Sequence, residues 1–181
     1  MVSDKLNKEK WLEGALKLVR NSGIESVKIV QLAQQLGVTT GSFYWHFSNR
    51  KELYDAILQY WLKTMTDDVI EAAKIFQGTP QERIFHLMDS VMSNGMARCD
   101  MAIWHWAQSD EKANTVFQQA LNQRFEFATW MFEEVGFSRH QAESRGEMMV
   151  YYMMGKSALA SNNQKQCKNT LKLQFKILIS R

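Results

Sequence analysis

Hydroxyl, aromatic and imidazole side chains crowd one short stretch of the chain, residues 39–47. Hydroxyl and imidazole groups can hydrogen-bond to the base edges and phosphate oxygens of DNA, and apolar groups can contact thymine methyls. On a helix, Phe43 and Phe47 share one face, so we predict that both are buried and that the polar side chains face outward. The candidate DNA-contacting residues of this stretch are Thr39, Thr40, Ser42, Tyr44, Trp45 and His46.

Positive charge surrounds this stretch without entering it. Lys28 precedes it, and Arg50 and Lys51 follow it at the start of the next predicted helix. Residues 1–52 hold eight Lys and Arg against five Asp and Glu, whereas residues 53–181 hold fourteen of each. The net charge of +3 therefore lies wholly in the first third of the chain and indicates an anionic partner there. We predict that the three flanking basic residues contact phosphate groups.

A few long helices must position these residues. The 181 residues include nine Gly and a single Pro, so turns are scarce and an all-α fold is favoured. Apolar residues recur at helical spacing up to about residue 22, over 27–36 and over 40–47. Two short helices separated by a turn that contains Gly37 are typical of a helix-turn-helix.

Longer helices are predicted in the rest of the chain. One begins after Asn49, which can cap it together with Glu52, and continues to about Gly78. Pro80 suits the first position of the helix that follows. Further helices are predicted over 80–94, 100–109, 111–134, 139–161 and 164–180, with breaks at Gly95, Asp110, Gly136 and 161–163.

The segment from Ala33 to Leu53 carries a specific motif. It consists, at fixed spacing, of Ala33, Gly37-Val38-Thr39, Gly41-Ser42-Phe43-Tyr44, His46-Phe47, Arg50 and Leu53. This motif resembles the DNA-binding module of the tetracycline-repressor (TetR) family of bacterial regulators, closely over residues 9–60 and more loosely, in helix order, beyond them. The resemblance implies a helix-turn-helix DNA-binding domain over residues 1–52 and a helical effector-binding and dimerisation domain over residues 53–181.

The same resemblance implies a function. It makes residues 40–47 the recognition helix, Tyr44 a phosphate contact, and the chain a cytoplasmic transcriptional repressor. Such a regulator is a homodimer joined through its last two helices. It binds a palindromic double-stranded DNA operator, and its helical core takes a small apolar or aromatic effector.

Thr40 departs from the family pattern, which commonly has a basic residue at this position. The predicted recognition helix therefore has no Lys or Arg that could bind guanine through two hydrogen bonds. We expect the choice of bases to depend instead on Thr40, on Trp45, on contacts with thymine methyls, or on DNA shape.

Large apolar side chains are dense over residues 100–134, where the resemblance places the effector. The alternative is that these Met and aromatic residues only fill an irregular core. Arg124 lies on an apolar helix face, so it must be paired if it is buried. It either binds an acidic group of the effector or pairs with Asp110 or another carboxylate, and we favour the structural pair. The candidate effector contacts are Trp104, Trp106, Arg124, Phe125, Met149 and Tyr152.

Other function classes find little support in the sequence. Cys99 and Cys167 stand alone, which indicates neither a disulfide framework nor a zinc site and suits a reducing cytosol. No apolar run approaches the roughly 20 residues of a membrane span. The motifs of di-iron bundles, zinc proteases, serine hydrolases and phosphate-binding loops are absent from the sequence, so we predict no catalytic residue, metal or cofactor. The alternatives are a helix-turn-helix factor without an effector and an all-α enzyme whose site is built from long-range contacts.

Overall fold

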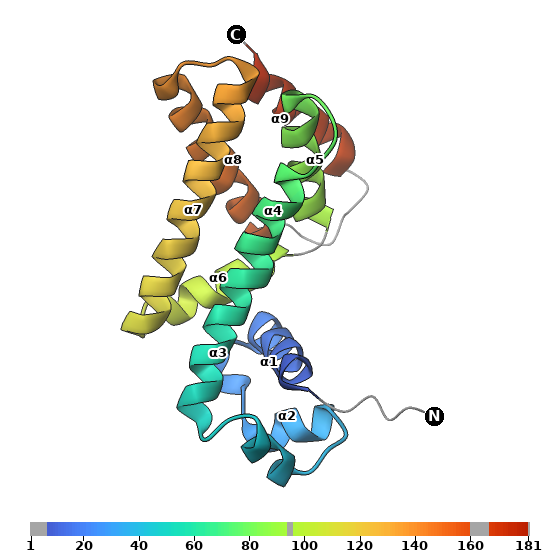
Figure 1. Cartoon of the computed structure of the whole chain (residues 1–181), viewed down its shortest axis with the longest axis vertical. Coiled ribbons are helices and arrows are strands. Elements are labelled where there is room, and N and C mark those ends of the chain that lie inside the picture. Colours follow the sequence, from blue (N-terminus) through green and yellow to red (C-terminus); the bar gives the residue numbers. More distant parts are fainter. Residues whose placement is uncertain (1–6, 94–95, 160–166, 181) are drawn as a thin grey trace. The chain divides into compact units, whose positions relative to one another are not determined.

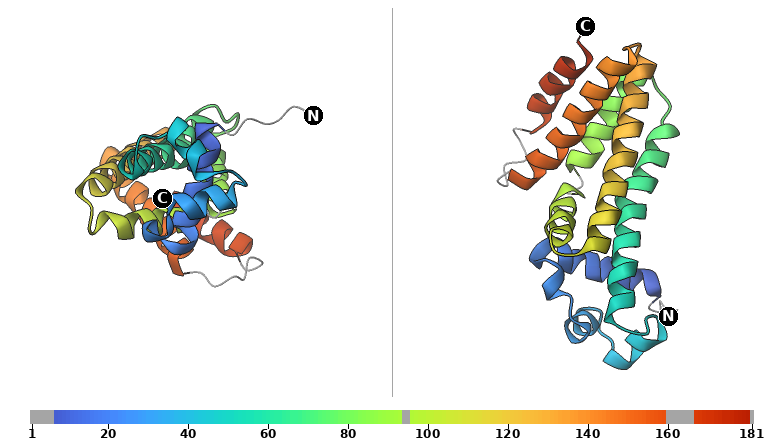
Figure 2. Two further views of the ribbon diagram at one scale, coloured as in Figure 1. Left: turned by 90° about the horizontal axis from the view of Figure 1, so that it is seen from below. Right: turned by 90° about the vertical axis from the view of Figure 1, so that its left-hand side faces the viewer.

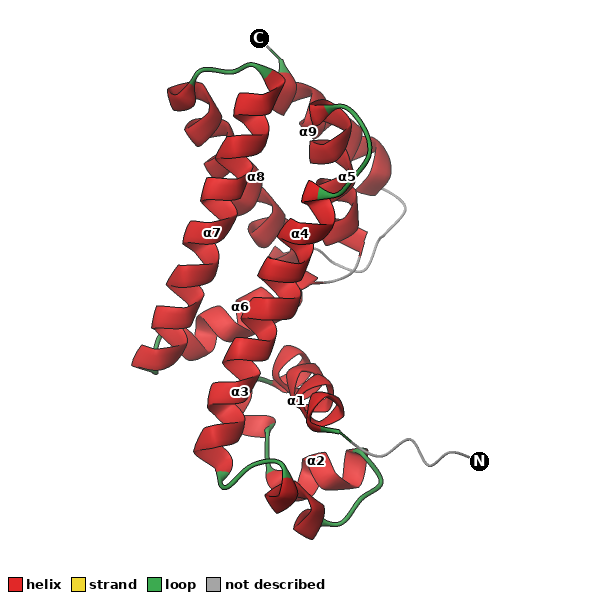
Figure 3. Ribbon diagram, in the orientation of Figure 1, coloured by secondary structure: helices red, strands yellow, loops and turns green. Residues whose placement is uncertain are grey.

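The described part of the chain is entirely helical. The computed structural model describes residues 7–93, 96–159 and 167–180. Within these ranges the chain forms helices joined by loops, with no strand (Figure 3), which confirms the predicted all-α fold. None of the helices in these ranges combines the length and the apolarity of a membrane-spanning segment.

The chain folds into two compact units, which are described separately below. Unit 1 comprises Met1–Lys63 and Ala102–Phe117, and unit 2 comprises Thr64–Met101 and Gln118–Arg181. A segment from the middle of the sequence is thus part of the same unit as the N-terminal helices. The predicted boundary between a DNA-binding and an effector-binding domain, after residue 52, is a functional division and stays a prediction.

The N-terminal part of unit 1 has the helix order that the sequence predicts. α1 ends at Gly23, which has a φ of 76°, a conformation that favours glycine. The predicted helix over 40–47 is present but differs in kind, because it is a tight 3₁₀ helix that ends at Trp45. Helices of this type are used in short runs, which suits so short a segment. The elements are α1 (Lys8–Ser22), η1 (Ile24–Ser26), α2 (Ile29–Gln35), η2 (Thr40–Trp45) and α3 (Arg50–Leu62) (Figure 1).

Aromatic side chains form the core of unit 1. Trp11, Phe43 and Phe47 are fully buried. The ring centroids of Trp11 and Phe43 lie 5.6 Å apart, and those of Phe43 and Phe47 lie 5.3 Å apart. Trp61 on α3 stacks on Phe117, with centroids 6.0 Å apart. The predicted burial of Phe43 and Phe47 is confirmed, and their burial fixes η2 against α1.

The helix predicted from Asn49 to Gly78 is interrupted. A π-helical turn, η3 (Lys63–Asp67), separates α3 from α4 (Asp68–Lys74), and α4 ends before Gly78. A π-turn departs from the regular hydrogen-bond pattern of an α-helix and is frequently found at functional sites. The side chains that contact this π-turn are therefore candidates for a functional site.

Most of the longer helices match the predicted ranges closely, but the helix predicted over 100–109 begins earlier, at Met96. Pro80 begins α5 as predicted, and Gly136, which has a φ of 99°, follows the end of α7. In unit 2, α5 lies beside both α8 and α9 (Figures 1 and 2). The predicted breaks at Gly95 and 161–163 lie outside the described residues. The elements are α5 (Pro80–Ser93), α6 (Met96–Ala107), α7 (Glu111–Val135), α8 (Arg139–Leu159) and α9 (Cys167–Ile179).

Within unit 2, α7 and α8 approach each other closely at Gly146. A Cβ atom added to Gly146 would lie 3.1 Å from the backbone nitrogen of Thr129 and 3.2 Å from the Cβ atom of Ala128. Both distances are shorter than an ordinary van der Waals contact. The absence of a side chain at Gly146 therefore allows the two helices to pack.

A Gly146→Ala substitution is expected to lower the free energy of unfolding by roughly 1–2 kcal/mol, because overpacking against α7 exceeds the gain in helix propensity. Gly155 on the same helix is the matched control, since an added Cβ would meet no atom within 4 Å. Gly155→Ala should raise the free energy of unfolding by about 0.5–1 kcal/mol. Urea unfolding of both variants measures the difference, and equal effects would contradict the close approach.

Candidate functional site

The 3₁₀ helix η2 presents two aromatic side chains to solvent. Phe43 and Phe47 are buried, whereas Tyr44 is 62% exposed and Trp45 is 88% exposed. The Tyr44 ring packs edge-on against Phe43, with centroids 5.2 Å apart, so its position is fixed by the core beneath it. Exposed tryptophan is uncommon because its large apolar area is costly in water, which marks this surface as a candidate contact surface.

The hydroxyl- and imidazole-bearing side chains of this segment differ in their exposure to solvent. Thr39 and Thr40 are exposed. Thr39 occupies the N-cap position of η2, but its side chain makes no capping hydrogen bond there among the described residues. Instead, the Ser42 hydroxyl donates to the Thr39 carbonyl at 2.8 Å. His46 is half-buried, with its ring 6.5 Å from those of Trp11 and Phe47.

The three basic residues predicted to flank the surface are all exposed: Lys28, Arg50 and Lys51. The Arg50 guanidinium lies over the ring of Tyr54, 4.8 Å from its centroid. Partial burial raises the pKa of Tyr54 above its ordinary value, so this phenol is neutral at physiological pH. The cation–π contact holds Arg50 at the start of α3, close in sequence to η2.

A capping box fixes the start of α3. The Asn49 Oδ1 atom accepts the backbone N–H of Glu52 at 2.9 Å, and Glu52 Oε2 accepts the backbone N–H of Ser48 at 2.7 Å. The predicted cap is confirmed, with the difference that Glu52 reaches Ser48 rather than Asn49. The hydrogen bonds from Ser48, helped by Lys8 3.5 Å away, hold the pKa of Glu52 below its ordinary value.

A Glu52→Gln variant is expected to be less stable than wild type at pH 7, because the ionised carboxylate is the better acceptor at this cap. A lowered pKa in the folded state means that this stabilisation is complete above the unfolded pKa, about 4.3. It is lost as the pH falls through the lower folded value. Thermal unfolding midpoints of the two proteins should therefore converge between pH 5 and the acid limit of folding, and a constant difference would contradict the capping role.

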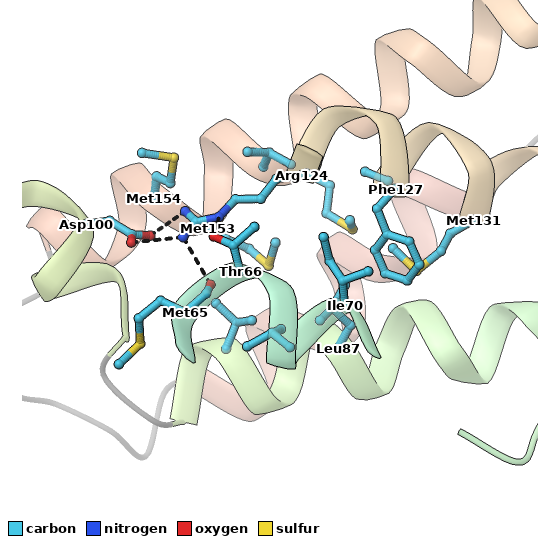
Figure 4. A pocket seen from close by; sticks show the side chains of 15 residues that line it. Met65, Thr66, Ile70, Leu87, Asp100, Arg124, Phe127, Met131, Met153 and Met154 are labelled. Carbon is cyan, nitrogen blue, oxygen red and sulfur yellow. Dashed lines mark hydrogen bonds and ion pairs between the residues drawn. The ribbon is translucent and has the colours of Figure 1, made fainter. Parts of the chain in front are cut away.

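Unit 2 contains a narrow apolar cavity with a volume of about 60 Å³. Met, Leu, Ile, Val and Phe side chains form most of its wall, and one polar cluster closes one end (Figure 4). Met side chains adopt many shapes at low cost, so the cavity can adapt to different ligands. Its lining residues include Met65, Thr66, Ile70, Leu87, Asp100, Arg124, Phe127, Met131, Met149, Met153 and Met154.

Arg124 is the centre of the polar cluster. Its Nη1 and Nη2 atoms donate to the two carboxylate oxygens of Asp100 at 2.7 and 3.1 Å. Nη2 also donates to the Met65 carbonyl at 3.1 Å, and Nε donates to the Thr66 hydroxyl at 3.0 Å (Figure 4). Met65 and Thr66 belong to the π-turn η3. One side chain thus ties α7 to α6 and to the interruption between α3 and α4.

The structural pair favoured from the sequence is confirmed, but its acid is Asp100 and not Asp110. Asp110 instead caps α7, where its Oδ1 atom accepts the Ala113 N–H at 2.8 Å. A sequence signal for Asp100 exists, because it lies three and seven residues before Ile103 and Ala107, on an apolar helix face. No comparable signal marks Met65 or Thr66.

The structure brings two of the six predicted effector contacts to the cavity, Arg124 and Met149. Phe125 packs edge-on against Tyr151, and the Tyr152 hydroxyl donates to Gln174 Oε1, so neither lines the cavity. Two others belong to unit 1. Trp106 is buried against Tyr54 with centroids 5.4 Å apart, and Trp104 is partly exposed. Within the described ranges no three His, Cys, Asp or Glu side chains gather as a metal site.

Comparison with known proteins matches one segment of the chain to a family. Residues 12–57, which run from α1 into α3 and include the whole of η2, match the sequence pattern described as "Bacterial regulatory proteins, tetR family". This segment of the chain is that of the TetR family. The match covers the aromatic surface of η2 and the capping box of α3, so the site described above lies in the segment by which TetR proteins are recognised.

The curated relatives that align with the chain are regulators. The HTH-type transcriptional regulator AcrR of Shigella flexneri is 28% identical over 51% of this chain and 45% of its own length. The class D tetracycline repressor protein of Escherichia coli is 38% identical over 29% of this chain and 24% of its own length. The chain therefore aligns with less than half the length of either relative.

A solved TetR transcriptional regulator from Legionella pneumophila extends the likeness in fold. It superposes with a TM-score of 0.78 at 14% identity, covering 98% of this chain and 97% of that chain. At this identity the likeness establishes the TetR-family fold and nothing more specific.

The last two helices of the chain, α8 and α9, leave apolar side chains in solvent. Met148 and Tyr151 on α8, and Leu173 and Ile177 on α9, are each more than half exposed. Residues 148 and 151 are three apart and residues 173 and 177 are four apart, so each pair lies on one face of its helix. Such faces commonly mark contact surfaces.

Proposed function

We propose that this chain is a ligand-responsive transcriptional repressor that binds a palindromic DNA operator as a homodimer. The observation that carries the proposal is the surface of η2, where Tyr44 and Trp45 stand exposed on a buried aromatic base. This surface lies in the matched TetR segment, together with three exposed basic residues, Lys28 before it in the sequence and Arg50 and Lys51 after it. DNA-binding proteins need that combination, because basic groups hold phosphates while other side chains read the bases.

In this proposal the two kinds of side chain have separate roles. Lys28, Arg50 and Lys51 bind phosphate groups, and Tyr44 and Thr39 add hydroxyl contacts to the same strand. Thr40, Ser42, Trp45 and His46 face the major groove. Because residues 39–47 contain no Lys or Arg, no bidentate guanine contact forms from this segment, and Trp45 contacts thymine methyl groups instead.

The exposed apolar faces of α8 and α9 support the homodimer. Two copies that bury Met148, Tyr151, Leu173 and Ile177 against each other would remove these side chains from water, which favours association. A dimer also presents two helix-turn-helix units to half-sites about 34–36 Å apart, which explains a palindromic operator.

The cavity of unit 2 supports a ligand response, and a small apolar or aromatic molecule is the proposed effector. The cavity lies next to η3, the turn that follows α3 in the chain. A ligand that enters must displace Met side chains there and thereby act on the helix that continues from the DNA-binding segment. A regulator of this kind acts in the cytoplasm, where its operator is found.

Selection from a library of random DNA duplexes, followed by fluorescence anisotropy on the selected sequence, tests the proposal. We expect a palindromic consensus and an affinity that falls steeply with salt, because binding releases counterions. Absence of any enriched sequence would contradict the proposed function.

Trp45→Ala is expected to weaken binding to the selected duplex by about tenfold or more, because the apolar contact with the groove is lost. The unfolding midpoint should not change, since the side chain is 88% exposed in the unbound protein. Ile75→Ala is the matched control, because Ile75 is an exposed apolar residue of unit 2 and should leave the affinity unchanged. Equal affinities of all three proteins would show that Trp45 does not contact DNA.

A further inference from the structure

We propose that the cavity of unit 2 selects uncharged ligands, and that Asp100 is the residue that excludes organic anions from Arg124. The proposal rests on the proposed function in one respect, namely that this cavity is where an effector binds. It differs from the simplest expectation for an arginine beside a cavity, which is that the arginine binds an acidic group of the ligand.

Arg124 and Asp100 form a closed, buried ion pair. The side chains are 15% and 5% exposed, and both carboxylate oxygens accept hydrogen bonds from the guanidinium. The remaining guanidinium nitrogen, Nε, donates to Thr66, and Nη2 makes a second bond to the Met65 carbonyl. Every nitrogen of Arg124 is therefore engaged, and the charge of the pair is neutral.

An organic anion would gain little from this cluster. Its carboxylate would have to displace Asp100 or join it, and either arrangement leaves a net negative charge among buried apolar side chains. The anion would also lose its hydration on entering a wall made mostly of Met, Leu, Ile and Val. The charge balance of the Arg124–Asp100 pair therefore disfavours the binding of an acidic ligand.

An organic cation would leave an unbalanced positive charge in the same place. A positive group beside Asp100 would compete with Arg124 and leave the guanidinium without its counter-charge. An uncharged ligand needs neither exchange, because it can occupy the apolar part of the cavity while the pair stays closed. The Met residues around that part, which include Met131, Met149 and Met153, can move to enlarge a cavity of only about 60 Å³.

Isothermal titration calorimetry with three ligands of one chain length tests the selection. 1-Octanol, octanoate and octylammonium are titrated at pH 7 into the full chain without DNA. We expect 1-octanol to bind at least about tenfold more tightly than either ion, which is the size of effect that an unbalanced buried charge produces. Octanoate binding as tightly as 1-octanol, or no binding of 1-octanol, would overturn the proposal.

Asp100→Asn provides the second test, because it keeps the shape of the side chain and removes its charge. Arg124 then carries an uncompensated charge at the cavity, so octanoate affinity should rise at least about tenfold while 1-octanol affinity changes little. Unchanged octanoate affinity would overturn the role given to Asp100. If this variant does not fold, the wild-type series decides alone.

A variant whose cavity is filled by a larger side chain tests where the ligand binds. Ile70 is half-buried in the wall, and Ile70→Trp should abolish 1-octanol binding by filling the space. Persistent binding would place the ligand elsewhere and overturn the proposal. Since calorimetry involves no DNA, failure of 1-octanol to release a selected duplex would count against the proposed ligand response and not against the charge selection.

Discussion

Asp100→Ala is expected to lower the free energy of unfolding by about 3–5 kcal/mol, because it leaves the buried guanidinium of Arg124 without a counter-charge. The cost is large since only 15% of the Arg124 side chain is exposed to water. Urea unfolding followed by tryptophan fluorescence measures the change. A loss below about 1 kcal/mol, the value typical of a surface ion pair, would contradict the buried pair.

A double variant separates the charge from the hydrogen bonds. Asp100→Leu with Arg124→Met removes both charges and replaces them with side chains of similar volume, a change that is often neutral for an ion pair alone. Here it also removes the donors to Met65 and Thr66. We therefore expect the double variant to be more stable than Asp100→Ala and still about 1–3 kcal/mol less stable than wild type.

The helix-turn-helix could be predicted from the sequence because its signals are local. Asn49 and Glu52 are three residues apart, and the positive φ of Gly37 suits the predicted turn of the helix-turn-helix. Phe43 and Phe47 are four residues apart and both point into one core, so their burial follows from helical spacing alone. This spacing predicts a helix but does not distinguish an α-helix from the 3₁₀ helix that η2 forms.

The cavity could be predicted only in part, because its lining comes from segments far apart in the sequence. The need for Arg124 to pair follows from its place on an apolar face, but the choice between Asp100 and Asp110 depends on how α6 and α7 are placed. Trp104 and Trp106 look like ligand contacts by residue type, yet residues 102–117 belong to unit 1. A large aromatic residue on a helix fits a core as well as a ligand site, and only tertiary contacts decide.

The π-turn η3 has no signature in the sequence for a related reason. The apolar spacing from Leu53 to Met65 is that of a regular helix, so it predicts no interruption. The structure supplies the compensating contacts, since Arg124 donates to Met65 and Thr66 within the turn. A departure from regular helix geometry that is stabilised by a distant side chain cannot be read from neighbouring residues.

Ile177→Glu is expected to convert the proposed homodimer to a monomer. Binding to a selected palindromic duplex should weaken by at least about 100-fold, because two linked helix-turn-helix units bind far more tightly than one. In a symmetric interface each substitution occurs twice, so two carboxylates would be brought into the same apolar contact. The folded chain should tolerate the change, because the Ile177 side chain is 64% exposed in the single chain.

Ile75→Glu is the matched control for this change, because it places the same charge on another exposed apolar residue that does not belong to α8 or α9. Light scattering coupled to size-exclusion chromatography gives the mass of each protein, and anisotropy gives its affinity. The control should remain dimeric and bind DNA as wild type does. A dimeric Ile177→Glu protein with full affinity would exclude α9 from the interface. A monomer that kept full affinity would show that one helix-turn-helix unit is enough for operator binding.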